Sequence, residues 1–499
     1  MQRGTWSRVI GAIGVTALVT LMLAAPAWSA IEFFGTARVL PTYYSNFDFN
    51  DSKNDMFVAN EGGMAKGEHI RAELRLGWKA AGEKWSVKMI TEADVIMQKD
   101  TADRSFYAGA EKDGNPNSGG EFGIERVELL YAFNPALELQ TGWDTRALDI
   151  RTGGLLFGDD HPFIGFRGDL SKTTSYELLY MPIQNMSSIK NEPFDSDTVN
   201  DWRVYSLKLN HKVGSFDLSP FYAYSDNEDK EAQVHYYGFE VLGKIGILKP
   251  SFEVVFADGE FDNGKDISSM AAFAGLEVEV SKEFTPYVAL RYTQGDDDAT
   301  DNDVKGWVGI TDIGRFTPLM GMDGGILSED LGQSYGATLY SYAPERASAA
   351  GVYQKADFVN GLDEGTEEYS AAEAAYKAAL TSNNYGGISN GGSGDNPGQL
   401  IAAIGAKGDL SRWVDKLSYK TQVFMIWYDE TNNLNNARNP GKKVDDYAGT
   451  TFDLQFKYAL DENFSLGYIF GIFVPGAGIK DQFGDDPAMT NCLSLVWSY

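Results

Sequence analysis

Residues 69–80, HIRAELRLGWKA, alternate between apolar and polar side chains and decide the fold class. One face of this segment is apolar and carries Ile70, Ala72, Leu74, Leu76 and Trp78. The other face carries Arg71, Glu73, Arg75 and Lys79. A period of two is typical of a β-strand with one apolar face. After the turn AGEK (81–84) the alternation resumes over 85–95, so the two segments predict a β-hairpin that is apolar on one side and charged on the other.

The length of these strands favours a membrane barrel over a soluble sandwich. Soluble strands average about five or six residues, whereas a tilted strand needs about ten to cross a bilayer. Similar hairpins repeat along the chain, with short turns such as HKVGS (211–215) and LDENF (460–464). Longer polar stretches separate them, at 45–67, 98–120, 145–160, 183–200, 226–232, 259–268, 295–398, 430–446 and 475–488.

Short turns that alternate with long loops are the asymmetry of outer-membrane barrels. The sequence therefore predicts an all-β fold, a transmembrane antiparallel β-barrel of about 16–18 strands with long external loops. The barrel is expected to start at Ile31 and end at Tyr499. Weak alternation at 161–170 and 399–409 leaves sixteen and eighteen strands both open.

The first thirty residues are expected to be a secretory signal peptide. Arg3 and Arg8 precede an apolar run from Val9 to Leu23, and small residues follow it. We place the cleavage between Ala27 and Ala30, which leaves 31–499 as the barrel domain. An uncleaved membrane anchor is the alternative, but the apolar run is short for a spanning helix.

The composition argues against nucleic acid as a partner. Without the two arginines of the signal, the chain has 40 basic and 71 acidic residues, a net charge of −31 that repels phosphates. Cys492 is the only cysteine of the sequence, so no intramolecular disulfide can form. Aromatic residues make up 13% of the chain, and a barrel in an outer membrane would display them to lipid.

The longest polar stretch, 295–398, contains one segment with a helical pattern. In YSAAEAAYKAAL (369–380), Ser370 and Glu373 have the spacing of a capping box, which predicts a short helix. A loop of this length is unusual in a compact domain. We expect it to form a folded cap over the pore; a separate small domain is the alternative, but the segment has few aliphatic residues for a core.

The chain ends in another alternating segment, CLSLVWSY (492–499). Its apolar face carries Leu493, Leu495, Trp497 and Tyr499. This segment resembles the C-terminal signal of Gram-negative outer-membrane proteins, which the barrel-assembly machinery recognises and which usually ends in Phe. Tyr499 takes that place here. An ordinary amphipathic strand at a chain end is the alternative.

The signal, the hairpin asymmetry and the terminal strand together resemble the general (homotrimeric) porins of Gram-negative bacteria, over essentially the whole mature chain. The pattern looks closest to the porins of sulfate-reducing bacteria. The resemblance implies a multi-pass β-barrel in the outer membrane that contacts lipid and lipopolysaccharide, is inserted by the barrel-assembly machinery and assembles as a homotrimer.

Catalytic patterns are scarce in the sequence. The four histidines, His69, His161, His211 and His235, form no HExxH motif, and one cysteine cannot form a pair. We expect no enzyme activity and no cofactor. A Ser-His-Asp site stays open because such triads are recognised by geometry, and Asp159-Asp160-His161 faintly resembles the Asp and His residues of barrel proteases.

The acidic run GDDDATDND (295–303) is a calcium candidate through Asp296, Asp298, Asp301 and Asp303. The glycine and glutamate of an EF-hand loop are missing from their positions. A solvated acidic loop is therefore the favoured interpretation.

Basic residues on the pore-facing positions of the first strands form one positive wall, which includes Arg38, Arg71, Arg75 and Arg126. Porins constrict their pore by folding the loop after strand five inward, and the resemblance places that loop at 145–162, after the strand LELQTGW (137–143). Four carboxylates of this region, Asp144, Asp149, Asp159 and Asp160, are predicted to face the four arginines across the constriction. An external loop lying on the rim is the alternative.

The sequence thus predicts a porin for passive diffusion of small hydrophilic solutes. The surplus of carboxylates around the mouth predicts a preference for cations. Two alternatives remain: a substrate-selective outer-membrane channel, and a structural or adhesin barrel with a plugged lumen.

Overall fold

The computed structural model describes residues 31–45, 68–96, 123–149, 151–185, 201–228, 231–298, 300–307, 309–310, 366, 369–370, 397–432, 434, 436, 439, 441–482 and 484–499. The expected signal peptide lies outside the described residues.

The described chain forms one sheet of 19 strands, all but one of them 9 to 14 residues long. The strands are β1 (Glu32–Ser45), β2 (Glu68–Ala81), β3 (Trp85–Ile96), β4 (Gly123–Asn134), β5 (Leu137–Ala147), β6 (Gly158–Ser171), β7 (Thr174–Asn185), β8 (Asp201–Val213), β9 (Phe216–Asn227), β10 (Ala232–Gly243), β11 (Leu248–Phe261), β12 (Asp266–Val278), β13 (Thr285–Thr293), β14 (Asp303–Val304), β15 (Gln399–Asp409), β16 (Leu417–Tyr428), β17 (Tyr447–Ala459), β18 (Phe464–Pro475) and β19 (Ala488–Ser498).

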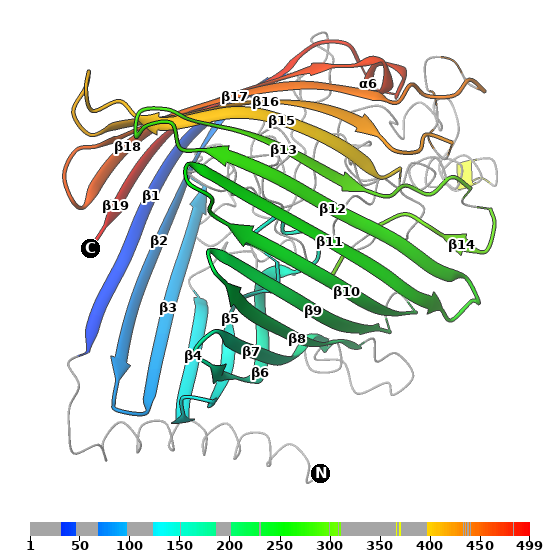
Figure 1. Cartoon of the computed structure of the whole chain (residues 1–499). Helices are drawn as coiled ribbons and strands as arrows, with labels where there is room; N and C mark the ends of the chain where they lie inside the picture. Colours follow the sequence, from blue (N-terminus) through cyan, green and yellow to red (C-terminus); the bar gives the residue numbers. More distant parts are fainter. Residues whose placement is uncertain are drawn as a thin grey trace.

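The sheet closes into a barrel because β1 pairs with both β2 and β19 (Figure 1). The two-residue β14 pairs in parallel with β12, while β13 pairs directly with β15. Eighteen antiparallel strands therefore make up the wall. The predicted transmembrane barrel is confirmed. Of the predicted 16–18 strands, the structure has eighteen. Closure pairs every strand edge, which a sheet in hydrocarbon requires.

Alternation along each strand separates the two faces of the wall. On β13, Val288 and Leu290 are about half exposed, whereas Tyr287, Ala289 and Arg291 are buried. Val288 and Leu290 face outward, whereas Tyr287, Ala289 and Arg291 face the barrel interior. This is the arrangement that a pleated strand between lipid and an aqueous lumen requires.

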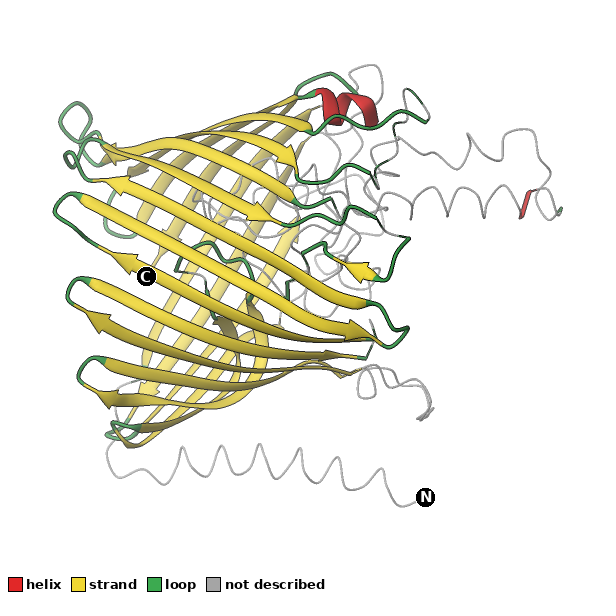
Figure 2. Cartoon of the chain, turned by 45° about the vertical axis from the view of Figure 1, so that its right-hand side comes forward, coloured by secondary structure: helices red, strands yellow, loops and turns green. Residues whose placement is uncertain are grey.

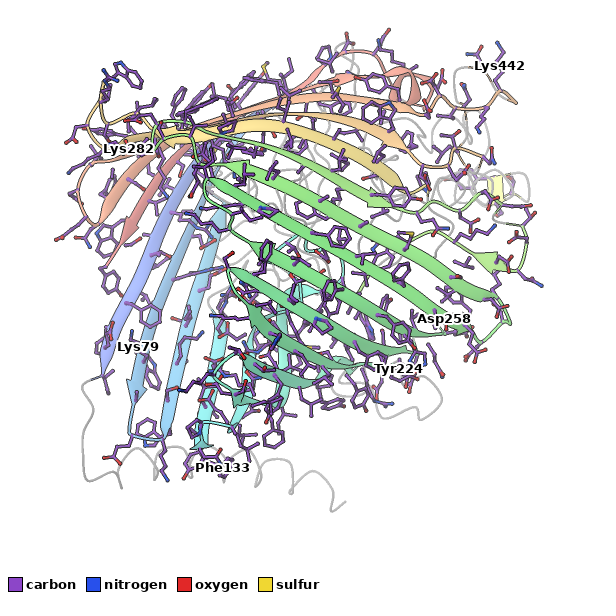
Figure 3. All side chains as sticks on the ribbon, viewed as in Figure 1. Lys79, Phe133, Tyr224, Asp258, Lys282 and Lys442 are labelled. Carbon is purple, nitrogen blue, oxygen red and sulfur yellow. The ribbon has the colours of Figure 1, made fainter. Side chains whose placement is uncertain are left out.

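The two ends of the barrel differ. Short turns connect the strands at one end, where the C-terminus also lies (Figure 2). The strand ends that flank the longer connections, among them 148–157, 294–398, 429–446 and 476–487, lie at the other end, called the external end below. Figure 3 shows Lys282 at the short-turn end and Asp258 and Lys442 at the external end.

The final strand closes the barrel with its apolar positions outward. Leu493, Trp497 and Tyr499 are about 40–45% exposed, while Cys492 and Ser494 are buried. The rings of Trp497 and Tyr499 stack with centroids 4.8 Å apart. Leu495 is in register with Val39 of β1. Recognition of these residues by the assembly machinery stays a prediction.

Helices are a minor part of the described structure. α6 (Ala477–Gln482) lies in the connection between β18 and β19. No helix among the described residues is both long and apolar enough to span a membrane.

Of the predicted helix 369–380, only Tyr369 and Ser370 are described, and both are helical. The N-cap of this helix is Thr366, so the predicted capping role of Ser370 is wrong. The Thr366 hydroxyl accepts a hydrogen bond from Tyr369 N at 3.1 Å, and its carbonyl accepts one from Ser370 N. The hydroxyl bond spans three residues, as an N-cap does, so the helix begins before Ser370.

Candidate functional site

Charged side chains line the inner wall of β1 to β6. Arg38 of β1 makes a two-pronged contact with Glu73 of β2, with Nε 2.9 Å from Oε1. Arg75 lies 3.1 Å from Glu73 and 3.3 Å from Glu125, and also pairs with Glu92 of β3. These pairs lie within β2 or connect it to β1, β3 and β4, so charges of both signs follow one another around the wall.

The network continues on β3 to β6. Arg126 of β4 lies 3.2 Å from Asp160 and 3.7 Å from Asp144. Asp144 also pairs with Lys88 of β3. Nearby, Arg146 bonds Glu128 at 2.5 Å, and its guanidinium stacks 3.6 Å from the centroid of the Phe163 ring. The aromatic contact fixes the orientation of Arg146.

Several predicted constriction residues lie in this network. Arg38, Arg75, Arg126, Asp144 and Asp160 do so through the contacts above. Their contacts run along the wall between nearby strands. The side chains of Arg71 and Asp159 lie outside the described structure, although their backbones pair in β2 and β6. A transverse field across the lumen stays a prediction.

Sequence analysis missed part of this network. It identified the positive wall but gave no role to the glutamates that neutralise it, chiefly Glu125 and Glu128 of β4. Alternation over 123–134 could have placed Glu128 on the face of Arg126. No sequence signal indicated which carboxylate pairs with which cation.

Exposure within the network varies for both signs of charge. The side chains of Lys88, Arg75 and Arg126 are 33%, 27% and 22% exposed. Asp160 and Glu125 are 22% and 18% exposed, whereas Glu73 and Asp144 are only 3% and 5% exposed. The lumen therefore meets cations and carboxylates together.

The connection between β5 and β6 folds into the barrel. It spans 148–157, shorter than the predicted 145–162, because 145–147 and 158–162 belong to the strands. We call 148–157 the inner segment. The predicted loop is too long at its C-terminal end, because the DDHP run (159–162) lacks apolar alternation and nevertheless belongs to β6, where Asp160 is in register with Thr145.

Hydrogen bonds attach the inner segment to the opposite wall. The Thr152 hydroxyl lies 2.7 Å from Glu240 Oε1 on β10 and 2.7 Å from Glu253 Oε2 on β11. Gly153 N donates to the same Glu253 oxygen at 2.7 Å. Lys208 Nζ of β8 donates to the carbonyl of Leu148. The segment thus lies along the inner face of β8 to β11 rather than on the rim.

Apolar packing completes this attachment. Leu155, Leu156 and Phe157 are fully buried. The indole N–H of the buried Trp307 donates to Leu155 O at 3.2 Å, and Ile310 N donates to Leu156 O at 2.9 Å. Part of the long connection after β13 therefore covers the inner segment.

A glycine permits the close approach of the inner segment to β12. A β-carbon on Gly153 would lie 2.6 Å from Cβ of Phe273 and 3.0 Å from Glu253 Oε2. Real Cβ atoms do not approach so closely, so a larger residue would push the segment away from the wall.

The predicted calcium residues serve their own loop. Asp296 and Asp301 accept hydrogen bonds from the backbones of Asp298 and Asp303, at 2.9 and 2.8 Å. The Thr300 hydroxyl donates to Asp298, and this bond lowers the pKa of Asp298. Among the described residues no cluster of His, Cys, Asp or Glu has the arrangement of a metal site. Calcium binding stays a prediction.

Three described histidine side chains make structural contacts. The His161 ring stacks on Phe157 with centroids 5.3 Å apart. His211 shares a hydrogen bond with Thr174, and His235 shares one with Tyr222. These contacts include no serine nucleophile.

This geometry defines a class of protein, the outer-membrane β-barrel with a polar interior narrowed by an inward connection. No protein-family model and no curated protein sequence matches the chain. Solved structures do resemble it. OccAB4 of Acinetobacter baumannii has a TM-score of 0.52 and 12% identity, covering 95% of this chain and 100% of its own.

OccAB2 of the same organism has a TM-score of 0.52 and 10% identity, over 94% of this chain and 98% of its own. OccK9 (OpdG) of Pseudomonas aeruginosa has a TM-score of 0.51 and 12% identity, over 94% of this chain and 98% of its own. At such identity the similarity shows the shared barrel fold.

Proposed function

We propose that the protein is a porin, a channel for passive diffusion of small hydrophilic solutes across the outer membrane. The observation that carries this proposal is the closed wall of eighteen strands, apolar outside and charged inside along β1 to β6. Barrels of this strand number are wide enough to leave an aqueous channel.

Planar-bilayer recording tests the proposal. Purified folded protein is expected to give stable conductance steps that scale with the salt concentration. Heat-unfolded protein serves as the control. Absence of steps from protein that is folded by electrophoretic mobility would favour the structural or adhesin barrel.

We further propose that the channel prefers cations. Support comes from the external end, where Asp297, Asp298 and Asp303 are exposed, as are Asp429 and Asp445. Their field would concentrate cations at the mouth. Reversal potentials in a potassium chloride gradient test the sign, and anion preference would contradict the charge argument.

A second candidate function is a channel selective for solutes with carboxylate groups. The partly exposed guanidinium groups of Arg75 and Arg126 favour it, because guanidinium groups bind carboxylates in a two-pronged geometry. Saturable block of conductance by succinate, and none by its neutral diamide, would support this function. Equal effects of both solutes would leave the unselective porin.

We also propose assembly as a homotrimer, with lipid and lipopolysaccharide around it. The support is the resemblance to general porins and the exposed apolar outer face, for example Val288 and Leu290. A mass of one protomer in mild detergent would contradict the trimer.

A further inference from the structure

The inner segment reaches far into the barrel. It connects the external ends of β5 and β6, yet its contacts lie toward the opposite end of the wall. Thr152 bonds Glu240, which lies three residues before β10 ends at Gly243. Arg151 donates to Asp217, the second residue of β9, at 2.8 Å. Short turns follow β10 and precede β9 here, and short turns face the periplasm in outer-membrane barrels. The tip of the segment, Arg151 and Thr152, therefore lies near the periplasmic end of the lumen.

The position of Asp217 along its strand gives the depth of the tip. A strand rises about 3.3 Å per residue, so Asp217 lies about 3 Å from Phe216, where β9 begins, and about 33 Å from Asn227, where it ends. By alternation, Asp217 shares a face with Ser219 and Phe221, which are buried inside the barrel. Its carboxylate therefore faces the lumen close to the periplasmic mouth.

Contacts on both sides of the tip fix it to the wall. Lys208 of β8 donates to the Leu148 carbonyl, which precedes the tip, and forms an ion pair with Glu240. Gly153 N, which follows the tip, donates to Glu253 at 2.7 Å. The side chains of Lys208, Glu240 and Glu253 are at least 94% buried. Because these polar contacts are shielded from water, they hold the tip against the wall.

Arg151 is the part of the tip that water reaches. Its side chain is 48% exposed, whereas every other described residue of the inner segment is buried. Since Arg151 bonds a residue of the inner face, its exposed part faces the lumen. Lys212 of β8, in register with Asp217, is also exposed. Two cations thus flank one carboxylate, so the lumen carries a local excess of positive charge here.

We propose that Arg151 is a specificity-determining residue at the periplasmic mouth of the channel. Its guanidinium group attracts anions and opposes the passage of cations, while Asp217 holds the group in place. Carboxylates at the external end, such as Asp297, have the opposite effect, so the two mouths differ in the sign of their charge. The effect on permeation rests on the proposed porin function, whereas the placement of Arg151 does not.

Labelling from one side of the membrane tests the placement without requiring conduction. Arg151→Cys is made in full-length protein with Cys492→Ala, and intact Gram-negative cells receive a maleimide–polyethylene glycol conjugate too large to pass through a porin. The controls are Lys442→Cys at the external end and Lys282→Cys at the short-turn end (Figure 3). We expect Lys442→Cys to react in intact cells. Lys282→Cys and Arg151→Cys should react only after the outer membrane is opened with EDTA.

Two outcomes of the labelling would overturn the placement. Reaction of Arg151→Cys in intact cells would show that the tip is open to the outside. Absence of reaction in opened cells would show that the residue does not face the periplasmic mouth. Heat-dependent electrophoretic mobility establishes that each variant is folded before its labelling is scored.

Reversal potentials in a salt gradient test the specificity. Arg151→Gln should raise the ratio of cation to anion permeability about twofold, the scale on which a unit charge about 8 Å away acts in water. Arg151→Lys keeps the positive charge and should keep the ratio. Asp217→Asn should lower the ratio, because it leaves Arg151 without its counter-charge. Arg412→Gln, at an exposed arginine in the turn between β15 and β16, is the matched control and should leave the ratio unchanged.

The two experiments separate the levels of inference. Equal permeability ratios in Arg151→Gln and Arg412→Gln would overturn the role of Arg151 in specificity and leave the porin function standing. If no variant conducts while the labelling is as expected, the porin function fails and the placement of Arg151 stands.

Discussion

Gly35 and Tyr499 exchange two backbone hydrogen bonds, Gly35 N to Tyr499 O at 3.2 Å and Tyr499 N to Gly35 O at 3.1 Å. The last residue of the chain is thereby joined to the fourth residue of β1. This pair is one end of the seam at which the first and last strands meet. Defects there should affect closure of the whole barrel.

Substitution Gly35→Ala should destabilise the barrel by about 1–3 kcal/mol, as overpacking does. A β-carbon at this position would lie 2.5 Å from Arg75 O and 2.6 Å from the Tyr499 ring. Urea unfolding of the refolded protein, followed by tryptophan fluorescence, measures the change. Gly123→Ala is the matched control, because a β-carbon there meets nothing within 4 Å. Equal midpoints for the two variants would contradict the prediction.

Substitution Trp307→Ala should loosen the inner segment. It removes a fully buried side chain and the hydrogen bond to Leu155 O. Loss of a buried aromatic residue lowers the free energy of unfolding by about 3–5 kcal/mol. Here the lost contact joins the inner segment to the connection after β13. We expect more open-channel current noise than in wild type. Trp413→Ala, at an exposed position in a short turn, should leave the noise unchanged; similar noise in both variants would count against the assignment.

The double substitution Asp159→Asn with Asp160→Asn should shift selectivity toward anions. Asp160 lies 3.2 Å from Arg126, so its neutralisation leaves that guanidinium charge less balanced. A unit charge about 8 Å from a permeating ion contributes roughly 2 kcal/mol at an effective dielectric constant near 20. Reversal potentials in dilute salt measure the shift, which should shrink near 1 M salt because of screening.

Asp415→Asn is the control for the selectivity experiment. Asp415 is exposed in the short turn between β15 and β16, outside the charged network of β1 to β6. Unchanged conductance and selectivity in the double variant would place Asp160 outside the conduction path.

Cation preference should persist into mildly acidic solution. The pKa of Asp297 is lowered mainly by its hydrogen bond with Lys305, and that of Asp298 by its bond with Thr300. A carboxyl group with a lowered pKa stays charged as the pH falls through the ordinary aspartate range near 3.9. Burial raises the pKa of Asp296, which should lose its charge first.

Reversal potentials at a series of pH values test this prediction. The preference should remain at about pH 5 and be lost only at lower pH. Thr300→Val removes one donor to Asp298 and should move the loss to higher pH. Loss of preference already near neutral pH would point to other groups.

The sequence by itself determined the fold class. Side chains of a strand alternate because the backbone is pleated, so the pattern over 69–95 revealed both the strands and the face that meets lipid. Turn length then identified the two ends of the barrel. These are local properties, readable from residues close together in the chain.

In two places a local sequence pattern predicted the wrong structure. The absence of alternation at 159–162 predicts a loop, although the backbones of these residues pair in β6. Likewise, the capping-box spacing at Ser370 competed with Thr366, which caps the helix instead. Strand pairing and a neighbouring hydroxyl outweighed the local pattern in these two places.

Only the tertiary structure decided the partners of the charged groups. Every inward position of β1 to β6 has the same period, so alternation placed Arg75 inside but could not assign it to Glu92 and Glu125. The attachment of Gly153 to Glu253 joins residues 100 positions apart in the chain. It depends on the path of the inner segment through the lumen, and no short-range pattern of the sequence encodes that path.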